Sequence, residues 1–504
     1  MSADLRLSNA RIPGRPGLFD ITITDGRVAH FDQSGDAHTG RNGQLDSIDV
    51  AGGYVLPGLW DEHVHFTQWT LKSQWLDLAP ARSAADAADL VRARAELAEP
   101  GTVIIGQGFQ DGLWMDQPTA AMLDEAGEGA AVALISHDIH CVWLSSAAAA
   151  LFDAHVDVTG LLREQAAFDV NRKLANVPAE LLDPWAGATA TQAASRGVVG
   201  IVDFEMAWSR DIWSRRVAHG IRNLRVEFGI YPEHLDQAID DGLRTGDVID
   251  ETDGLISVGF HKVLIDGSLN TRTAYCFDHF PELVGQPNSF GLLTVQPADL
   301  VARLRRSASA GITAAVHAIG DHAVRIALDA FEEAGVGGRI EHAQLIAAED
   351  LPRFGELGVV ASLQPEHAMD DRDVADHHWA GRTDRAFPLR SLLDAGATIA
   401  LGSDAPVAPL DPWITIAAAV SRSRDNRSPW HPEQVISARE AFAGAARGRT
   451  EVAVGDIADL VVTELDPFTA TAEQLRTMPV ALTLLEGRVT WASPKPPGIG
   501  SHLR

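Results

Sequence analysis

Short apolar runs alternate with helical segments through the middle of this chain, and this alternation restricts its fold more than any other feature. Six runs have the length and composition of buried strands, and they cover residues 197–203, 258–265, 312–317, 338–342, 358–363 and 398–402. The segments between them have the spacing of apolar residues that is typical of helices. Repeated strand-then-helix units over about 350 residues predict an α/β fold, a (β/α)8 barrel of the TIM type.

An open, doubly wound sheet is the alternative for the same alternation of elements. That fold commonly carries a glycine-rich, phosphate-binding loop after its first strand. No such loop follows the first strand expected here, so we favour the closed barrel and assign it to residues 58–451.

The two ends of the chain have a different pattern, that of small antiparallel β-structure. Apolar residues alternate with polar ones up to Asp25-Gly26, a sequence that favours a hairpin turn. Near the other end, residues 457–462 have the pattern of a buried strand and residues 482–491 that of two short strands. We predict that residues 1–57 and 452–496 form one small β-sandwich, with the barrel inserted between its halves.

Residues 66–190 are too many for one strand–helix unit, and we predict an insertion there over the active-site face. Residues 102–106 and 131–136 both have strand patterns, and the sequence does not decide which belongs to the barrel. Eight of the 12 tryptophans lie between Trp60 and Trp213. Core packing is the more common role of a buried tryptophan. The clustering also predicts an apolar substrate pocket that includes Trp114 and Trp143.

The charge and the cysteine content narrow the partners and the compartment of the protein. A net charge of −28 repels phosphate backbones and anionic lipids, so we expect no nucleic-acid partner and no membrane partner. Cys141 and Cys276 are far apart and outside any CxxC pair, which is typical of a reducing compartment. The sequence shows no apolar leader and no apolar stretch of membrane length. We therefore predict a cytoplasmic protein that acts on a small molecule.

A metal-ligand pattern, His63-Val64-His65, follows an apolar run directly. Side chains two residues apart on a strand point to the same side, so both imidazoles can reach one cation. An HxH sequence occurs often by chance, and its weight depends on further ligands elsewhere in the chain.

Ionisable residues also stand at or just beyond the ends of later strands. His317 and His342 close two of the apolar runs, and Asp404 follows a third. Each alone could be a hydrogen-bonded histidine or a helix cap. Catalytic residues of a barrel occupy the carboxyl ends of successive strands, however, so this recurrence predicts one shared site. Imidazole and carboxylate ligands suit zinc, with manganese or iron as alternatives.

Lys262 lies inside an apolar run, where an unpaired charge is unfavourable. Only four of the 41 basic residues are lysines, so a lysine at this position indicates a need for the amine itself. Lysine can lose its proton when buried, which arginine cannot. The neutral amine can then add carbon dioxide and form a carbamate that bridges two cations. The alternative is a salt bridge between Lys262 and Asp266.

These residues, together with the Pro57-Gly58 pair before the first histidines, resemble the amidohydrolase superfamily. The similarity is greatest to the amidohydrolase-3 branch, which includes N-substituted formamide deformylase-like enzymes. The supporting motifs span nearly the whole chain in order, and they are Ala315-Val316-His317-Ala318-Ile319-Gly320-Asp321, Ile340-Glu341-His342-Ala343, Ser362-Leu363-Gln364-Pro365-Glu366-His367, Gly402-Ser403-Asp404-Ala405-Pro406 and Gly455-Asp456-Ile457-Ala458-Asp459-Leu460.

The resemblance implies two divalent metal ions, with zinc as the first choice. The implied ligands are His63, His65 and Asp404 for the more buried ion, His317 and His342 for the second, and carboxylated Lys262 as the bridge between them. Asp404 would also act as the catalytic base and acid.

The resemblance implies helpers around these ligands. His140 or His367 would assist a metal in stabilising the oxyanion. The chain departs from the branch at Asp138-Ile139-His140, where glycine is common in the middle, and this leaves the shape of the substrate pocket open.

Three further residues receive supporting roles. Arg272 would orient its own loop or bind a substrate carboxylate, with an ion pair to a nearby acid as the alternative. Asp321 and Glu341 would hold metal ligands in place from behind.

The function that the resemblance implies is hydrolysis of a linear, non-peptide amide C–N bond by a metal-bridging hydroxide. The same ligands could act on an ester, a lactone or a carbamate, because one fold supports many reactions. A metal-binding regulatory protein without catalysis is the third interpretation, which the complete ligand set disfavours. A homodimer is an expectation from the family alone.

Overall fold

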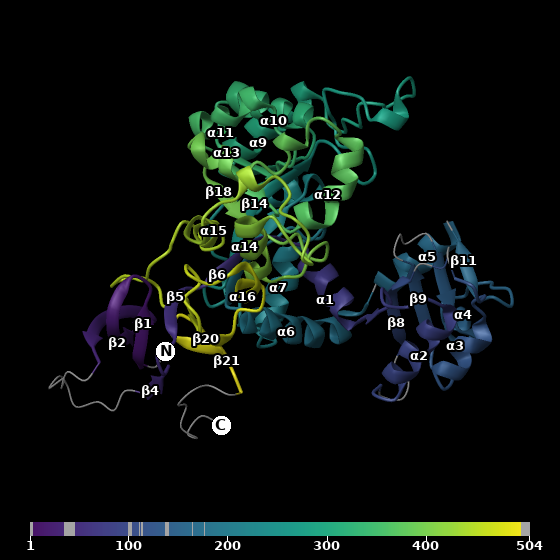
Figure 1. Ribbon diagram of the computed structural model, residues 1–504, viewed down its shortest axis with the longest axis horizontal. Helices are drawn as coiled ribbons and strands as arrows, with labels where there is room; N and C mark the ends of the chain where they lie inside the picture. Colours follow the sequence, from purple (N-terminus) through teal and green to yellow (C-terminus); the bar gives the residue numbers. More distant parts are fainter. Residues whose placement is uncertain are drawn as a thin grey trace. The chain divides into compact units, whose positions relative to one another are not determined.

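The structure is a computed structural model, and it describes residues 4–34, 46–98, 103–109, 111, 114–136, 141–163, 165–175 and 177–494. The chain divides into two compact units (Figure 1), Met1–Phe66 with Ala190–Arg504 and the smaller Thr67–Thr189. No helix of the described part is both long enough and apolar enough to cross a membrane.

Eight parallel strands form the central sheet of the larger unit. Their order follows the sequence, and they are β6 (Leu59–Val64), β12 (Val198–Asp203), β13 (Arg225–Ile230), β14 (Ile256–Leu264), β15 (Ala314–Ala318), β16 (Gly338–His342), β17 (Val359–Leu363) and β18 (Ile399–Leu401). Val64 and Ala405 form a parallel bridge between the two edges of this sheet, which nearly closes the barrel. The α/β barrel is therefore confirmed, and all six predicted strands belong to it.

Amphipathic helices cover the outside of the barrel. In α10 (Asp321–Ala334), for example, Val324, Leu328 and Phe331 share one face and pack in the same core as Val316 of β15. Gly335 ends this helix with a φ of 68°, a conformation that glycine adopts without strain. The other helices of this unit are α7 (Ser209–Ala218), α8 (Leu235–Asp240), α9 (Pro297–Ser309), α11 (Leu351–Leu357), α12 (His367–His378), α13 (Leu389–Asp394), α14 (Pro412–Ser421), α15 (Ala438–Gly444) and α16 (Ala472–Arg476).

Strands from both ends of the chain share one further sheet. Its order is β21-β20-β19-β5-β1-β2-β3, with β4 beside β1. The join is the antiparallel pair of β5 with β19, where Val461 lies opposite Leu56. The strands are β1 (Leu5–Ile12), β2 (Arg15–Thr24), β3 (Arg27–Gln33), β4 (Asp46–Asp49), β5 (Tyr54–Pro57), β19 (Leu460–Thr463), β20 (Val480–Leu485) and β21 (Arg488–Ala492).

The smaller unit has its own five-stranded sheet, in the order β11-β10-β9-β8-β7. The two strand patterns that the sequence left unassigned are β8 and β9, which pair with each other in parallel, so neither belongs to the barrel. The strands are β7 (Leu76–Asp77), β8 (Ile104–Phe109), β9 (Val132–Ser136), β10 (Cys141–Leu144) and β11 (Leu161–Arg163). The helices within its bounds are α2 (Ala84–Ala95), α3 (Ala120–Ala126), α4 (Ser146–Leu151) and α5 (Gln165–Ala175), and α1 (Phe66–Gln74) and α6 (Ala179–Ser195) lie at its boundaries.

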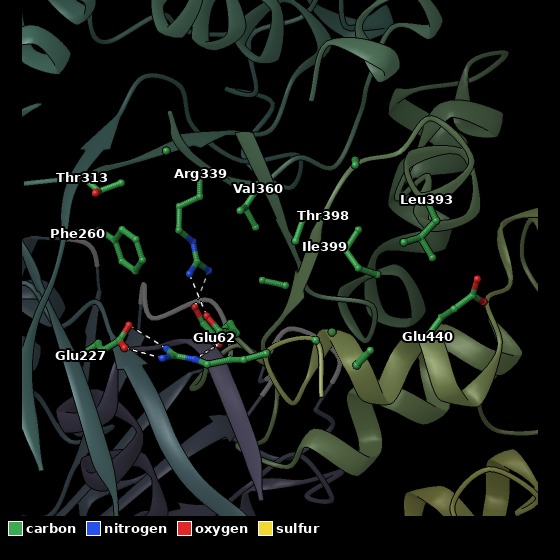
Figure 2. Close-up of a pocket in the computed structure, with 17 residues that line it drawn as sticks. Glu62, Glu227, Phe260, Thr313, Arg339, Val360, Leu393, Thr398, Ile399 and Glu440 are labelled. Carbon is green, nitrogen blue, oxygen red and sulfur yellow. Dashed lines mark hydrogen bonds and ion pairs between the residues drawn. The ribbon is translucent and has the colours of Figure 1, made fainter. Parts of the chain in front are cut away.

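A cavity of about 600 Å³ lies at the amino-terminal end of the barrel, and charged side chains cross it (Figure 2). Arg339 donates to one oxygen of Glu62 at 3.0 Å, and Arg447 donates to the other at 2.9 Å. Arg447 also reaches both oxygens of Glu227, at 2.5 and 2.9 Å. Both carboxylates in this network therefore face a guanidinium, and we refer to the four residues as the amino-end network.

Candidate metal centre

A cavity of about 360 Å³ lies at the opposite, carboxyl-terminal end of the barrel. Each of the eight strands contributes a lining residue at or just beyond its end, and in strand order these are His63, Met206, Tyr231, Lys262, His317, His342, His367 and Asp404. All of the metal ligands that the sequence predicts are among the residues that line this cavity.

Asp404 lies where the first histidine pair converges. Its Oδ1 is 3.4 Å from Nε2 of His65 and 3.6 Å from Nε2 of His63. The backbone N–H of Asp404 donates to the carbonyl of His63 at 2.7 Å, which fixes the carboxylate against β6. This close approach explains Gly402, since a Cβ there would lie only 2.6 Å from the backbone nitrogen of His63. Asp404 itself has a φ of 55°, a conformation that is uncommon for residues with a side chain.

The other oxygen of Asp404 faces a second set of imidazoles. Nδ1 of His342 and Nε2 of His367 each lie 4.0 Å from Oδ2 of Asp404. His317 lies beside His342, with ring centroids 4.5 Å apart, and its Nε2 is 3.4 Å from Oδ1 of Asp266. The donor atoms of His342, His367 and Asp404 all lie within 4.8 Å of one another, as do those of His63, His65 and Asp404.

Lys262 points into the same space from β14. Its side chain is buried, Nζ lies 3.1 Å from Nε2 of His63, and the ammonium lies 4.0 Å from the centre of the Phe204 ring. Asp266, the salt-bridge partner considered above, instead accepts hydrogen bonds from the backbone N–H groups of Ile319 and Gly320. Burial lowers the pKa of Lys262 to about 8, although Glu341 and Asp404 oppose this shift.

Burial sets the protonation states of the ligands. It lowers the pKa of His63 to about 4, with a further contribution from Lys262, and it lowers the pKa of His342 well below its usual value. Burial alone would raise the pKa of Asp404, but the imidazoles of His63, His65 and His342 outweigh it and hold this pKa well below its usual value. Neutral imidazoles and an ionised carboxylate are the forms that bind divalent cations, so the donor set fits such ions.

Two buried residues orient the ligands from behind. Oε2 of Glu341 lies 2.7 Å from Nδ1 of His63, which turns Nε2 of that ring toward the cavity. Arg339 of the amino-end network lies 2.5 Å from the other oxygen of Glu341. Oε1 of Gln364 lies 3.0 Å from Nδ1 of His342. Contacts of this kind fix the tautomer and the basicity of metal-binding histidines.

The remaining residues that the sequence singles out lie in several places. His140 is outside the described residues. Trp143 is buried in the core of the smaller unit, and the ring of Trp114 packs edge-on against it at 6.4 Å. Arg272 is exposed in a turn after β14. Asp321 accepts hydrogen bonds from the backbone of Phe277 and from Arg385, and so supports the loop after β14.

Sequence reasoning missed several polar residues of the cavity, among them Asp371 and Asn270. Asp371 lies one turn after His367 on α12, and its Oδ1 accepts a hydrogen bond from the side-chain amide of Asn270 at 2.9 Å. Helical spacing from His367 was the available signal for Asp371, because residues four apart share a helix face. Burial raises the pKa of Asp371, although the bond from Asn270 opposes this shift.

Comparisons with known proteins identify the family of the chain. A family model described as "Amidohydrolase family" matches residues 46–491. The N-substituted formamide deformylase of Arthrobacter pascens is 24% identical over 515 residues, which cover 93% of this chain and 94% of that protein. The Arabidopsis thaliana protein LONG AFTER FAR-RED 3 is 27% identical over 481 residues, 84% of this chain and 82% of its own.

A solved structure shows the same architecture. An uncharacterized metal-dependent hydrolase from Pyrococcus furiosus superposes with a TM-score of 0.77 and 25% identity, over 93% of this chain and 100% of that chain. The resemblance predicted from the motifs is therefore confirmed.

Proposed function

Because this chain belongs to the amidohydrolase family, we propose that it is a metal-dependent hydrolase that cleaves a linear, non-peptide amide C–N bond. One observation carries the proposal: histidines from four elements, Lys262 and Asp404 converge on a single cavity at the carboxyl end of the barrel. This end is where barrel enzymes keep their catalytic residues.

The donor atoms support two cation positions that share Asp404. His63 and His65 would hold one ion with Oδ1 of Asp404. His342 would hold the other, with His317 or His367 completing its ligands. The amine of Lys262 is buried and its pKa is lowered, so a neutral fraction is available to add carbon dioxide. The addition turns the amine into an anionic carbamate and releases one proton, and the new carboxylate would bridge the positions.

Asp404 is suited to move the protons of the reaction. Bound divalent ions would lower the pKa of a water and polarise the substrate carbonyl. The ionised Asp404 would accept the proton of the attacking water and return it to the leaving nitrogen as the C–N bond breaks. His367 lines the same cavity with its Nε2 3.2 Å from the carbonyl oxygen of Ser403, and from there its ring would assist the oxyanion.

The lining of the cavity favours a small substrate with an apolar group and an N–H donor. Met206, Leu264 and Val407 supply the apolar surface, and Asp371 and Asn270 supply the polar side. Since one relative is named as an N-substituted formamide deformylase, N-substituted formamides are the first compounds to test. Arg272 remains a candidate for a substrate contact and His140 for the oxyanion, whereas Trp114 and Trp143 pack in the core of the smaller unit.

The test is a turnover screen on protein reconstituted with zinc, manganese or iron, with metal content measured on the same samples. N-substituted formamides and longer linear amides are compared with matched esters, lactones and carbamates, and Asp404→Asn serves as the inactive control. Turnover of amides that disappears in Asp404→Asn supports the proposal. Faster turnover of the esters than of the matched amides would indicate that the protein is an ester hydrolase. No turnover by fully metal-loaded protein would favour a regulatory role.

A further inference from the structure

Two chain segments form one side of the candidate metal centre. The segment between β14 and α9 (residues 265–296), which we term the β14–α9 segment, contributes Asn270 to the cavity. Helix α12 contributes His367 and Asp371. The hydrogen bond from Asn270 to Asp371 joins the two segments at the cavity.

The same two segments meet again farther from the cavity, at a group of metal-binding side chains. Glu282 belongs to the short 3₁₀ turn η3 (Pro281–Leu283) of the β14–α9 segment, and His377 and His378 are the last two residues of α12. Nε2 of His377 lies 2.5 Å from one oxygen of Glu282, and Nδ1 of His378 lies 3.2 Å from the other. One ligand atom from each residue lies within 4.8 Å of the other two.

This arrangement differs from an ordinary surface ion pair. Two imidazoles and one carboxylate already converge, so a cation of Zn²⁺ size needs small side-chain movements to reach bonds of about 2.0–2.2 Å. The carboxyl end of a helix carries a partial negative charge, which favours a cation beside the last turn of α12. The side chain of His377 is 68% exposed and that of Glu282 is 34% exposed, so an ion can enter from solvent.

We propose that Glu282, His377 and His378 form a further zinc site, separate from the candidate metal centre, that fastens α12 to the β14–α9 segment. Three protein ligands leave the fourth zinc position to water or an external ligand. Nitrogen and carboxylate ligands also suit nickel and copper, so the site binds first-row divalent ions in general. It stands whether or not the protein hydrolyses amides.

The consequence of binding would appear at the cavity. Zinc at Glu282 would add a second fastening between segments that Asn270 and Asp371 already join. Helix α12 begins at His367 and ends at His378, so holding its far end restricts the motion of the residues at its near end. Zinc at the further site would thereby regulate the candidate metal centre by making the side of the cavity that α12 forms more rigid.

The experiment measures zinc stoichiometry on protein whose candidate metal centre is already loaded. Wild type and the single variants His377→Ala and Glu282→Gln are dialysed against low-micromolar free Zn²⁺, and bound zinc per chain is counted. We expect wild type to bind one more zinc than each variant, with at least about tenfold weaker binding in the variants. His431→Gln is the matched control, because His431 pairs with Glu433 at 2.9 Å, with one imidazole and one carboxylate rather than three ligands.

A second readout separates binding from a structural defect. Zinc should raise the melting temperature of wild type and of His431→Gln, and it should leave those of His377→Ala and Glu282→Gln unchanged. Equal zinc counts in wild type and the His377→Ala variant would overturn the proposal, as would an equal loss in His431→Gln. Because neither measurement uses turnover, failure of the proposed hydrolysis would not affect the result.

Discussion

The two ends of the barrel are built from the same strands and treat charge in opposite ways. At the amino-terminal end, the carboxylates of Glu62 and Glu227 both face guanidinium groups, so the charges cancel within the network. At the carboxyl-terminal end, burial keeps His63 and His342 neutral, and their lone pairs point toward a cavity. The charged groups at the amino-terminal end therefore pair with each other, whereas the carboxyl-terminal end leaves nitrogen lone pairs that could bind a metal ion.

Glu341 shows that the two ends are connected. It contacts Arg339 of the amino-end network with one oxygen and His63 of the candidate metal centre with the other. A charge pair that serves folding thus also contacts the residue that positions His63, a candidate metal ligand. Residues on the two sides of this connection should respond differently to substitution, and the following predictions test that difference in order of size.

Asp404→Asn should give the largest effect, confined to function. The amide cannot accept the proton of the attacking water, so kcat/KM should fall by about 10³-fold or more on any substrate the screen identifies. The free energy of unfolding of the metal-free protein should fall by less than the kinetic loss, because Asn keeps the φ of 55° and the backbone hydrogen bond to His63 and loses only the charge that the neighbouring imidazoles favour. The measurements are steady-state kinetics and urea unfolding. A loss of stability comparable to the kinetic loss would contradict the separation of the two ends.

Arg339→Met should affect mainly stability. The substitution removes the ion pairs of Arg339 with Glu62 and with Glu341, and both carboxylates are buried. Removing one partner of a buried ion pair costs about 3–5 kcal/mol, read from urea unfolding of the metal-free protein. Arg390→Met is the control, because Arg390 pairs at the surface with Asp394 and Glu440 and should cost less than about 1 kcal/mol. Equal losses of unfolding free energy in Arg339→Met and Arg390→Met would contradict the distinction between the buried amino-end network and a surface ion pair.

Acid should destabilise the metal-free protein from the carboxyl end first. The pKa of His63 is about 4 in the folded protein and about 6.5 in the unfolded chain, so between these values only the unfolded chain binds the proton. Stability should therefore fall as pH drops from about 6.5 to 4, by about 1.4 kcal/mol per pH unit for this group. His63→Asn should flatten that part of a plot of melting temperature against pH.

Glu62 supplies the contrast in the same pH series. Burial would raise its pKa, but Arg447 and Arg339 outweigh burial and lower this pKa below 4.5. Its contribution to stability is therefore complete above pH 4.5 and is lost only in stronger acid. A loss of the Glu62 contribution already at pH 6, measured with Glu62→Gln, would show that the two ends titrate together.

Glu341→Gln should give the smallest effect and the most direct test of the connection. The amide holds His63 less firmly than a carboxylate does, so metal affinity should fall by about 10- to 100-fold. Competition with a chromogenic chelator measures this change. Gln364→Leu is the matched control at His342, and a comparable loss is expected there because the same kind of contact is removed. Unchanged affinity in Glu341→Gln would mean that the amino-end network does not reach the metals.

Local sequence pattern was sufficient for much of the barrel and for the titratable residues at its strand ends that line the carboxyl-end cavity. Most residues of the six predicted strands are buried, and His317 and His342 close two of these strands while Asp404 follows a third. Strand β13 was not among the predicted strands, and it carries a charged residue, Glu227. That charge is tolerated because Arg447, 220 residues away in the chain, pairs with it.

The residues that the sequence left undecided depend on partners that are distant in the chain. The strands β8 and β9 look like barrel strands locally, and only their pairing with each other separates them from the barrel. Likewise, the side chain of Asp371 is held in the cavity by a hydrogen bond from Asn270, which lies 101 residues earlier in the chain. Periodicity records which face of an element is buried, but it does not record which other element covers that face.

The pairing of β5 with β19 also bears on how the chain is made. Strand β5 is complete after residue 57, whereas its partner begins at Leu460. At about 5–20 residues per second, translation leaves this edge of β5 without its native partner for tens of seconds. An unpaired edge strand is a template for other chains. Nascent or truncated chains that end before Leu460 would therefore be the forms of this protein most prone to aggregate.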